Sequence, residues 1–147
     1  MLFRSESFPQ NDTRGKHAST LFKILHVEGE YVIGLAFPQT GRQHQIRVHA
    51  MIHGLPLVGD KLYLGSFEMF QRFKDLLASD EEYDLMELPR HALHAVGLSI
   101  TYQNERRIFR SNLPKDLAQW ISEKVKVSIK DIEKDIATKL EDYFQKI

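Results

Sequence analysis

The stretch T-G-R-Q-H-Q-I-R-V-H-A-M-I-H-G, from Thr40 to Gly54, decides how the fold and function of this chain are interpreted. It follows a strand-like run that ends at Pro38, and its spacing predicts a helix that stops at Gly54. Its polar residues are arginines, histidines and glutamines, and no acidic residue occurs between Glu30 and Asp60. A Gly–Arg turn before a helix gathers free backbone N–H groups beside a guanidinium, which suits an anion such as phosphate. The residues alone leave two interpretations open, a cleft for a polyanion or a solvated surface helix.

The composition is that of one ordinary globular domain, with 147 residues, 42% hydrophobic and 27% charged. Twenty basic residues balance twenty acidic ones, which argues against binding nucleic acid through bulk charge but permits a local basic cleft. The absence of cysteine excludes disulfides and thiolate metal sites and fits a reducing compartment. No apolar run approaches the roughly 18 residues that span a membrane, and the N-terminal residues do not resemble a signal peptide. We therefore expect a cytoplasmic protein without a membrane partner.

Strand-like and helix-like segments flank the Thr40–Gly54 stretch on both sides. The first two strands are separated by a short turn and predict an antiparallel hairpin. The expected fold class is α+β, a mixed, largely antiparallel sheet with flanking helices. The predicted elements are strands at 18–27, 31–37, 90–102 and 107–110 and helices at 42–53, 114–121 and 128–144.

The expected organisation is an N-terminal arm, one α+β body with a helical, acidic insertion, and a C-terminal amphipathic helix. In the last segment Ile129, Ile132 and Ile136 recur at helical spacing. Ser128 followed by Asp131 predicts a capping box at the start of this helix. The boundaries are 1–17 for the arm, 18–125 for the body, 66–88 for the insertion within it, and 126–147 for the helix.

The histidines do not form a convincing metal site. His49 and His53 are four residues apart, as in the zinc-protease helix, but that motif requires Glu directly after the first histidine. Ala50 stands there, and no acid lies nearby to complete a ligand set. The sequence also lacks glycine-rich phosphate loops and the G-x-S-x-G motif. We therefore expect no metal ion, nucleotide-driven chemistry or serine hydrolysis.

The block from Thr40 to Tyr63, which continues L-P-L-V-G-D-K-L-Y after Gly54, closely resembles the signature of the RluA-type pseudouridine synthases. The family form is T-G-R-[TS]-H-Q-[IL]-R-V-H, followed after a short helix by G-x-P-[IL]-x-G-D-x-x-Y. The later run R-H-A-L-H-A-V-G-L-S-I resembles the L-H-A-x-x-L block of the same family. Gln43 departs from the usual threonine or serine. The resemblance covers roughly residues 15 to 122.

The resemblance implies a cofactor-free isomerase that converts uridine to pseudouridine in structured RNA, either rRNA or tRNA. In the family an aspartate attacks a uridine that is flipped out of the stack. By resemblance Arg47 pairs with that aspartate and keeps it ionised. Leu93 is expected to pack near the base, while Gly59 and Asp60 are expected to form a turn and a local cap. The residues expected to contact RNA are Gly41, Arg42, His44 and Gln45.

The nucleophile itself has no match in this chain. In the family it lies in an H-R-L-D-x-x-T-S-G block, and none of the nine aspartates here follows H-R-L. Residues 18–125 are therefore expected to form the C-terminal part of a catalytic domain, inactive alone and dependent on a missing N-terminal half. Exposed sheet edges in such a part favour self-association. Two alternatives remain, a non-catalytic RNA-binding module derived from a truncated synthase and a structural domain that binds a metal ion or a partner.

Overall fold

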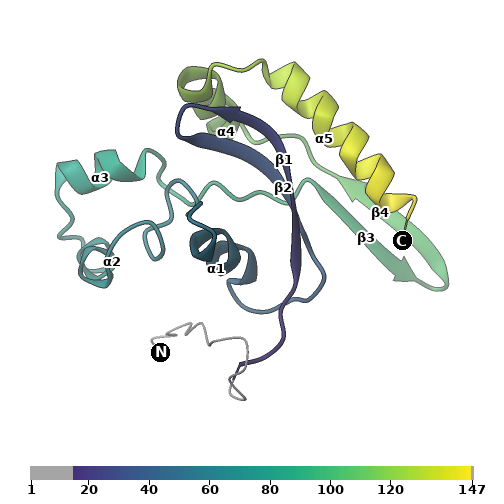
Figure 1. The fold of residues 1–147 in the computed structure, drawn as a ribbon, viewed down its shortest axis with the longest axis horizontal. Coiled ribbons are helices and arrows are strands. Elements are labelled where there is room, and N and C mark those ends of the chain that lie inside the picture. The colour runs from purple at the N-terminus through teal and green to yellow at the C-terminus, as the bar shows by residue number, and fades with distance from the viewer. Residues whose placement is uncertain (1–14, 147) are drawn as a thin grey trace. The chain divides into compact units, whose positions relative to one another are not determined.

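The computed structural model describes residues 15–146, and the α+β class is confirmed (Figure 1). Residues 1–14 of the predicted arm lie outside the described residues. No helix within 15–146 has the length and apolar character needed to cross a membrane. The elements are β1 (Thr20–Glu28), β2 (Tyr31–Pro38), α1 (Gln45–Ile52), α2 (Phe67–Lys74), α3 (Asp80–Met86), β3 (Gly97–Tyr102), β4 (Glu105–Arg110), α4 (Lys115–Trp120), the π-helix η1 (Ile121–Val125) and α5 (Ile129–Phe144).

The described strands pair as two separate antiparallel hairpins, β1–β2 and β3–β4. In the second hairpin the register runs from Gly97 opposite Arg110 to Tyr102 opposite Glu105. The predicted strand at 90–102 is too long, because β3 begins only at Gly97. A strand persists only while a neighbour supplies hydrogen bonds. Beyond Arg110 one further bond joins the N–H of Ser111 to the carbonyl of Val96, whereas the N–H of Ala92 donates to the carbonyl of Val58 instead.

The chain divides into two compact units, which comprise residues 15–23 with 36–92 and residues 24–35 with 93–146 of the described part. In the first unit α2 and α3 pack through Met69, Phe73 and Met86. A capping box starts α3, and its Glu82 also binds Arg72 on α2. This pair of helices falls within the segment 66–88, whose role as an insertion remains a prediction.

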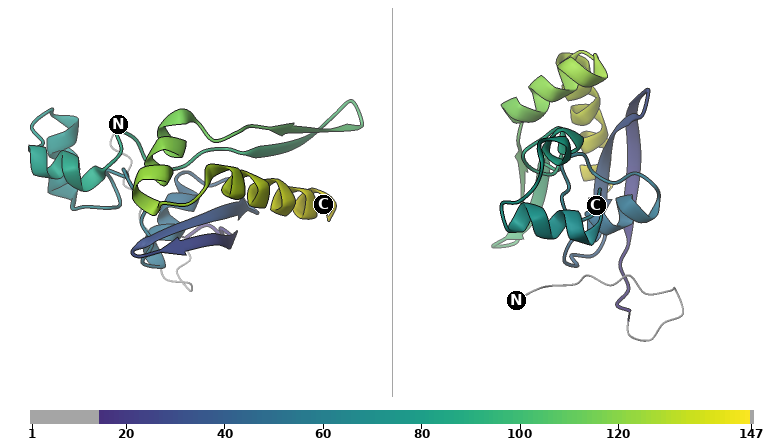
Figure 2. Two further views of the ribbon diagram at one scale, coloured as in Figure 1. Left: turned by 90° about the horizontal axis from the view of Figure 1, so that it is seen from above. Right: turned by 90° about the vertical axis from the view of Figure 1, so that its left-hand side faces the viewer.

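The second unit has α5 lying along the β3–β4 hairpin (Figures 1 and 2). The buried residues of α5 recur every four positions, as the amphipathic pattern predicts. Gly97 of β3 lies against Leu140 and Phe144, and a side chain there would crowd both. The buried stripe consists of Ile132, Ile136, Leu140 and Phe144.

The predicted capping box of α5 is wrong. Ser128 does precede the helix, but its side chain makes no capping hydrogen bond. The side chain of Asp131 is one methylene shorter than that of the usual glutamate, so it reaches back less easily to the backbone N–H of the N-cap. The backbone N–H of Asp131 instead donates to the carbonyl of Ser128.

Candidate functional site

The site begins with the turn that leads into α1. His44 has a left-handed backbone conformation with φ of 54°, so the helix starts at Gln45 and not at residue 42 as predicted. The side-chain oxygen of Gln45 accepts from the backbone N–H of Arg42 at 3.0 Å and closes the turn. Gly54 follows the C-cap with φ of 75°, and its predicted role as the helix stop is confirmed.

Gln45 anchors this turn to β1. Its Oε1 accepts from the hydroxyl of Thr40 at 2.6 Å as well as from Arg42. Its Nε2 donates to the carbonyl of Ser19 and to the hydroxyl of Thr20, both at 2.9 Å. The side chain is buried and its hydrogen-bonding capacity is used within the protein. The structure therefore gives Gln45 a structural role, whereas the sequence predicted an RNA contact.

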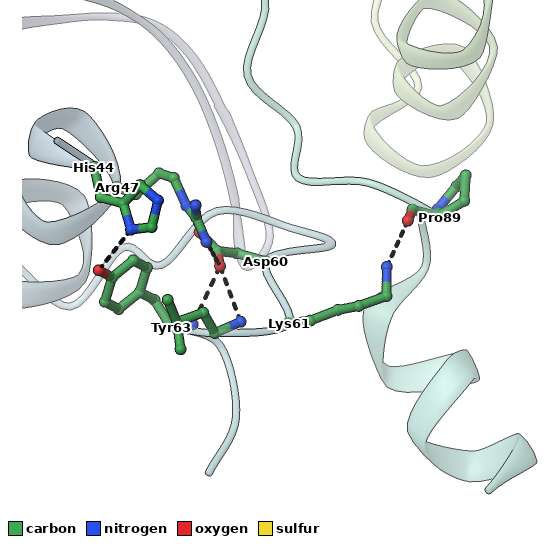
Figure 3. A network of polar contacts seen from close by, with 7 residues as sticks. His44, Arg47, Asp60, Lys61, Tyr63 and Pro89 are labelled. Atoms are coloured by element: carbon green, nitrogen blue, oxygen red, sulfur yellow. Dashed lines mark hydrogen bonds and ion pairs between the residues drawn. The ribbon is translucent and has the colours of Figure 1, made fainter. Parts of the chain in front are cut away.

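Arg47 projects from α1 onto a carboxylate that the sequence reasoning did not assign to it. Its Nε donates to Oδ2 of Asp60 at 2.7 Å and its Nη2 donates to Oδ1 at 2.6 Å (Figure 3). The carboxylate side chain is fully buried, while the arginine side chain is 15% exposed. Such a bidentate pair fixes the plane of the guanidinium as well as its position.

The loop that carries Asp60 is shaped by its own backbone. Oδ1 of Asp60 also accepts from the backbone N–H groups of Leu62 and Tyr63, so the predicted local cap is observed. Gly59 has φ of 73°, and a Cβ there would lie 2.1 Å from the carbonyl oxygen of Arg90. Only glycine permits this approach, and the approach places Asp60 beneath α1.

An aromatic ring and a histidine complete the surroundings of Arg47. The guanidinium carbon lies 4.9 Å from the centre of the Tyr63 ring, within the range of a cation–π contact. The Tyr63 hydroxyl shares a hydrogen bond of 3.1 Å with Nδ1 of His44 (Figure 3). Arg47 is thus held by an ion pair along one edge and by an aromatic face.

The charges of this cluster are set by its contacts. The hydrogen bond with Asp60 raises the pKa of Arg47. Burial opposes ionisation of Asp60, but hydrogen bonds from Arg47, Leu62 and Tyr63 outweigh it and lower the carboxyl pKa. Burial and the nearby guanidinium lower the pKa of both His44 and His91. At neutral pH the cluster holds one cation and one anion, flanked by neutral imidazoles.

One nitrogen of the guanidinium is left over by these contacts. Nη1 of Arg47 makes no hydrogen bond to any residue of the described part of the chain. A second carboxylate or a phosphate oxygen can therefore bind to that side without breaking the pair with Asp60. One feature of the sequence could have pointed to Asp60 as the partner of Arg47, because Asp60 is the first acidic residue after Glu30.

The other predicted site residues divide between the two units. Gly41 and Arg42 are exposed on the turn before α1, where Nε of Arg42 donates to the carbonyl of His17 at 3.3 Å. Leu93 is half-buried and belongs to the second unit, so its role near a base remains a prediction. Among residues 15–146 no three histidine, aspartate or glutamate side chains are grouped as metal ligands.

Comparison with known proteins finds relatives over most of this chain. Ribosomal large subunit pseudouridine synthase D of Pseudomonas aeruginosa is 40% identical over 110 residues, which cover 74% of the chain and 33% of that protein. The protein of the same name from Blochmanniella floridana is 33% identical over 123 residues, 82% of the chain and 37% of the relative. RNA pseudouridine synthase 2, chloroplastic, of Arabidopsis thaliana is 33% identical over 119 residues, 74% of the chain and 27% of the relative. The chain spans about a third of the length of these relatives. No family model and no solved structure matches the chain.

Proposed function

Since this chain belongs to the RluA-type RNA pseudouridine synthase family, we propose that it supplies the arginine-bearing part of a catalytic site that isomerises uridine in structured RNA. The observation that carries this proposal is the presentation of Arg47, whose Nε and Nη2 are bound to Asp60 while Nη1 remains open. None of the aspartates in this sequence follows H-R-L, so in the proposed site the nucleophilic aspartate is supplied by another part of a synthase catalytic domain.

In the proposed site that aspartate accepts a hydrogen bond from Nη1 of Arg47. A nucleophilic carboxylate must be ionised, and an adjacent arginine lowers the pKa of an aspartate by about 1–3 units. Asp60 already neutralises part of the arginine charge, so we expect the lower end of this range. The neutral state of His44 and His91 adds no further cation. Asp60 acts in this scheme as a positioning residue, since it orients the guanidinium and does not touch the uridine.

The exposed turn before α1 is the proposed RNA contact. Gly41 carries no side chain and has open space around it, so a phosphate can approach the backbone closely. The adjacent Arg42 supplies the cationic group. We expect Arg42→Ala to weaken RNA binding and to reduce the slope of log K against log salt by about one.

The test uses a reconstituted domain. This chain is combined with the part of the Pseudomonas aeruginosa relative that it does not match, about two-thirds of that protein, and incubated with a ribosomal RNA transcript. Ribosomal RNA is the first choice because the names of the bacterial relatives refer to the ribosomal large subunit. Pseudouridine is quantified by mass spectrometry after nuclease digestion.

We expect pseudouridine from the combined halves and none from this chain alone. Arg47→Lys keeps a positive charge but loses the fork geometry, and we expect it to reduce the rate about 100-fold, as removal of one preorganised donor does. Arg72→Ala serves as the matched control, because Arg72 is exposed and pairs with Glu82 at a distance from the site. Pseudouridine formed by this chain alone contradicts the proposal.

A second candidate is a non-catalytic RNA-binding module. The observation in its favour is that Arg47 already has an internal counter-ion, Asp60, and needs no nucleophile to be neutralised. This candidate predicts RNA binding that weakens with salt and with Arg42→Ala. It also predicts no pseudouridine in the reconstituted reaction, which separates it from the first proposal.

A further inference from the structure

The β3–β4 hairpin has two chemically different faces. Neighbouring residues of a strand point to opposite faces, and residues opposite each other in the ladder share a face. One face, called the inner face, contains Gly97, Ser99, Thr101, Arg106, Ile108 and Arg110. The other, called the outer face, contains Leu98, Ile100, Tyr102, Glu105, Arg107 and Phe109.

The inner face is covered in part by α5, since Ile108 on this face is 43% exposed. Gly97 lies against Leu140 and Phe144, which leaves no room for a side chain. Nη2 of Arg106 donates to the carbonyl of Phe144 at 2.6 Å, and Arg110 contacts Glu141 at 3.3 Å. The helix therefore binds the hairpin through both apolar and polar contacts.

The outer face exposes apolar side chains in a row. The exposed fractions are 56% for Leu98, 41% for Ile100, 55% for Tyr102 and 51% for Phe109. Together they expose on the order of 400 Å², the size at which an apolar patch on a monomer is often an interaction site. An isolated two-stranded sheet is marginally stable, and α5 supplies the helix that stabilises this one from the inner face. Within this unit no element covers the outer face.

The chemistry of the outer face favours a polypeptide over RNA. Leu98 and Ile100 are aliphatic, so only Tyr102 and Phe109 offer a ring on this face on which a base can stack. The cation on this face, Arg107, lies 3.6 Å from Glu105 and 5.7 Å from the centre of the Tyr102 ring. A face with four exposed apolar side chains and a single cation, which has an acid beside it, fits an apolar protein surface better than the phosphates of RNA.

We propose that the outer face is the docking surface for the rest of a synthase catalytic domain, the polypeptide that occupies the other two-thirds of the relatives. This inference rests on the proposed function, because it names the partner of the same site. The relatives are about three times as long as the part that this chain matches, so they contain additional chain that can cover this face. The occupant presents an apolar surface to Leu98, Ile100 and Phe109.

The experiment measures the affinity of this chain for the unmatched two-thirds of the Pseudomonas aeruginosa relative by isothermal titration calorimetry. Leu98→Lys places a charge in the outer face. Leu85→Lys is the matched control, because Leu85 is 54% exposed on α3 and lies in the other unit. We expect Leu98→Lys to weaken binding at least tenfold and Leu85→Lys to change it less than twofold. Circular dichroism checks that both variants retain the helix content of the original chain.

Three outcomes overturn the inference. They are no complex between the two polypeptides, a complex with the same affinity for both variants, and a self-association of this chain that Leu98→Lys abolishes. A complex that is sensitive to Leu98→Lys but makes no pseudouridine supports the docking surface and contradicts the proposed function. Pseudouridine formation that is unaffected by Leu98→Lys supports the proposed function and contradicts the docking surface.

Discussion

Replacing Asp60 by asparagine tests whether the ion pair with Arg47 organises the site. Asparagine has the same shape, so Gly59 and the loop backbone can keep their conformation. It lacks the charge, and its amide presents one oxygen where the carboxylate presents two. Arg47 then loses a bidentate partner that is fully buried in the native chain.

The expected loss of stability follows from the burial of the two partners. Removing one member of a buried ion pair costs about 3–5 kcal/mol, because the other charge is left uncompensated. Arg47 is 15% exposed and can recover part of its hydration. The asparagine oxygen also retains the backbone hydrogen bonds from Leu62 and Tyr63. We therefore expect Asp60→Asn to lower the free energy of unfolding by about 2–3 kcal/mol, below the range for a fully buried pair.

Urea unfolding followed by circular dichroism measures this difference. With a slope of about 2 kcal/mol/M, the unfolding midpoint falls by about 1–1.5 M. Asp84→Asn is the control, because Asp84 is exposed on α3, and we expect a change within about 0.5 kcal/mol. If Asp60→Asn is no more destabilising than Asp84→Asn, the pair with Arg47 does not organise this loop.

Three further predictions concern the same unit. The pKa of Asp60 is lower in the folded chain than in the unfolded chain. Its contribution to stability is therefore present above the unfolded pKa, near 4, and is lost as the pH falls through the folded pKa. Urea titrations in acid should show a smaller difference in stability between the original chain and Asp60→Asn. Gln45→Ala removes a buried amide with four hydrogen bonds and lowers the free energy of unfolding by about 2–3 kcal/mol. Gln43→Ala, at an exposed position, changes it by less than about 0.5 kcal/mol. Equal effects of the two changes contradict the structural role of Gln45. Gly59→Ala meets a backbone carbonyl and Gly29→Ala meets open space, so thermal unfolding should show Gly59→Ala to be worse by about 1–3 kcal/mol.

Local patterns predicted the elements where the chain uses its own residues to form them. Both hairpins and α5 appear because alternation and four-residue spacing are local signals. The start of α1 was misplaced because the side chain of Gln45 takes the place of a backbone hydrogen bond. That contact joins side chain and main chain in a turn, and no periodicity reveals it.

The candidate site was predicted in part. Resemblance singled out Arg47, but its partner within this chain, Asp60, lies 13 residues away across a loop. The pairing depends on the left-handed conformation of Gly59 and its approach to a carbonyl of Arg90. Gln45 was assigned to RNA because a polar residue in a signature block resembles a contact residue. Its amide faces inward, toward Ser19 and Thr20, which lie more than 20 positions earlier in the chain, so local sequence does not reveal the contact.

The pair between Arg47 and Asp60 also bears on the order in which such a protein can be made. An arginine that waits for a carboxylate from a distant part of the polypeptide would be an uncompensated charge during synthesis. Here the counter-ion is only 13 positions further along the chain, so it emerges from the ribosome within moments of the arginine. The charge of Arg47 is therefore compensated by its own segment, and in the proposed site this segment can fold whether the nucleophile comes from a part of the chain made earlier or from a separate polypeptide.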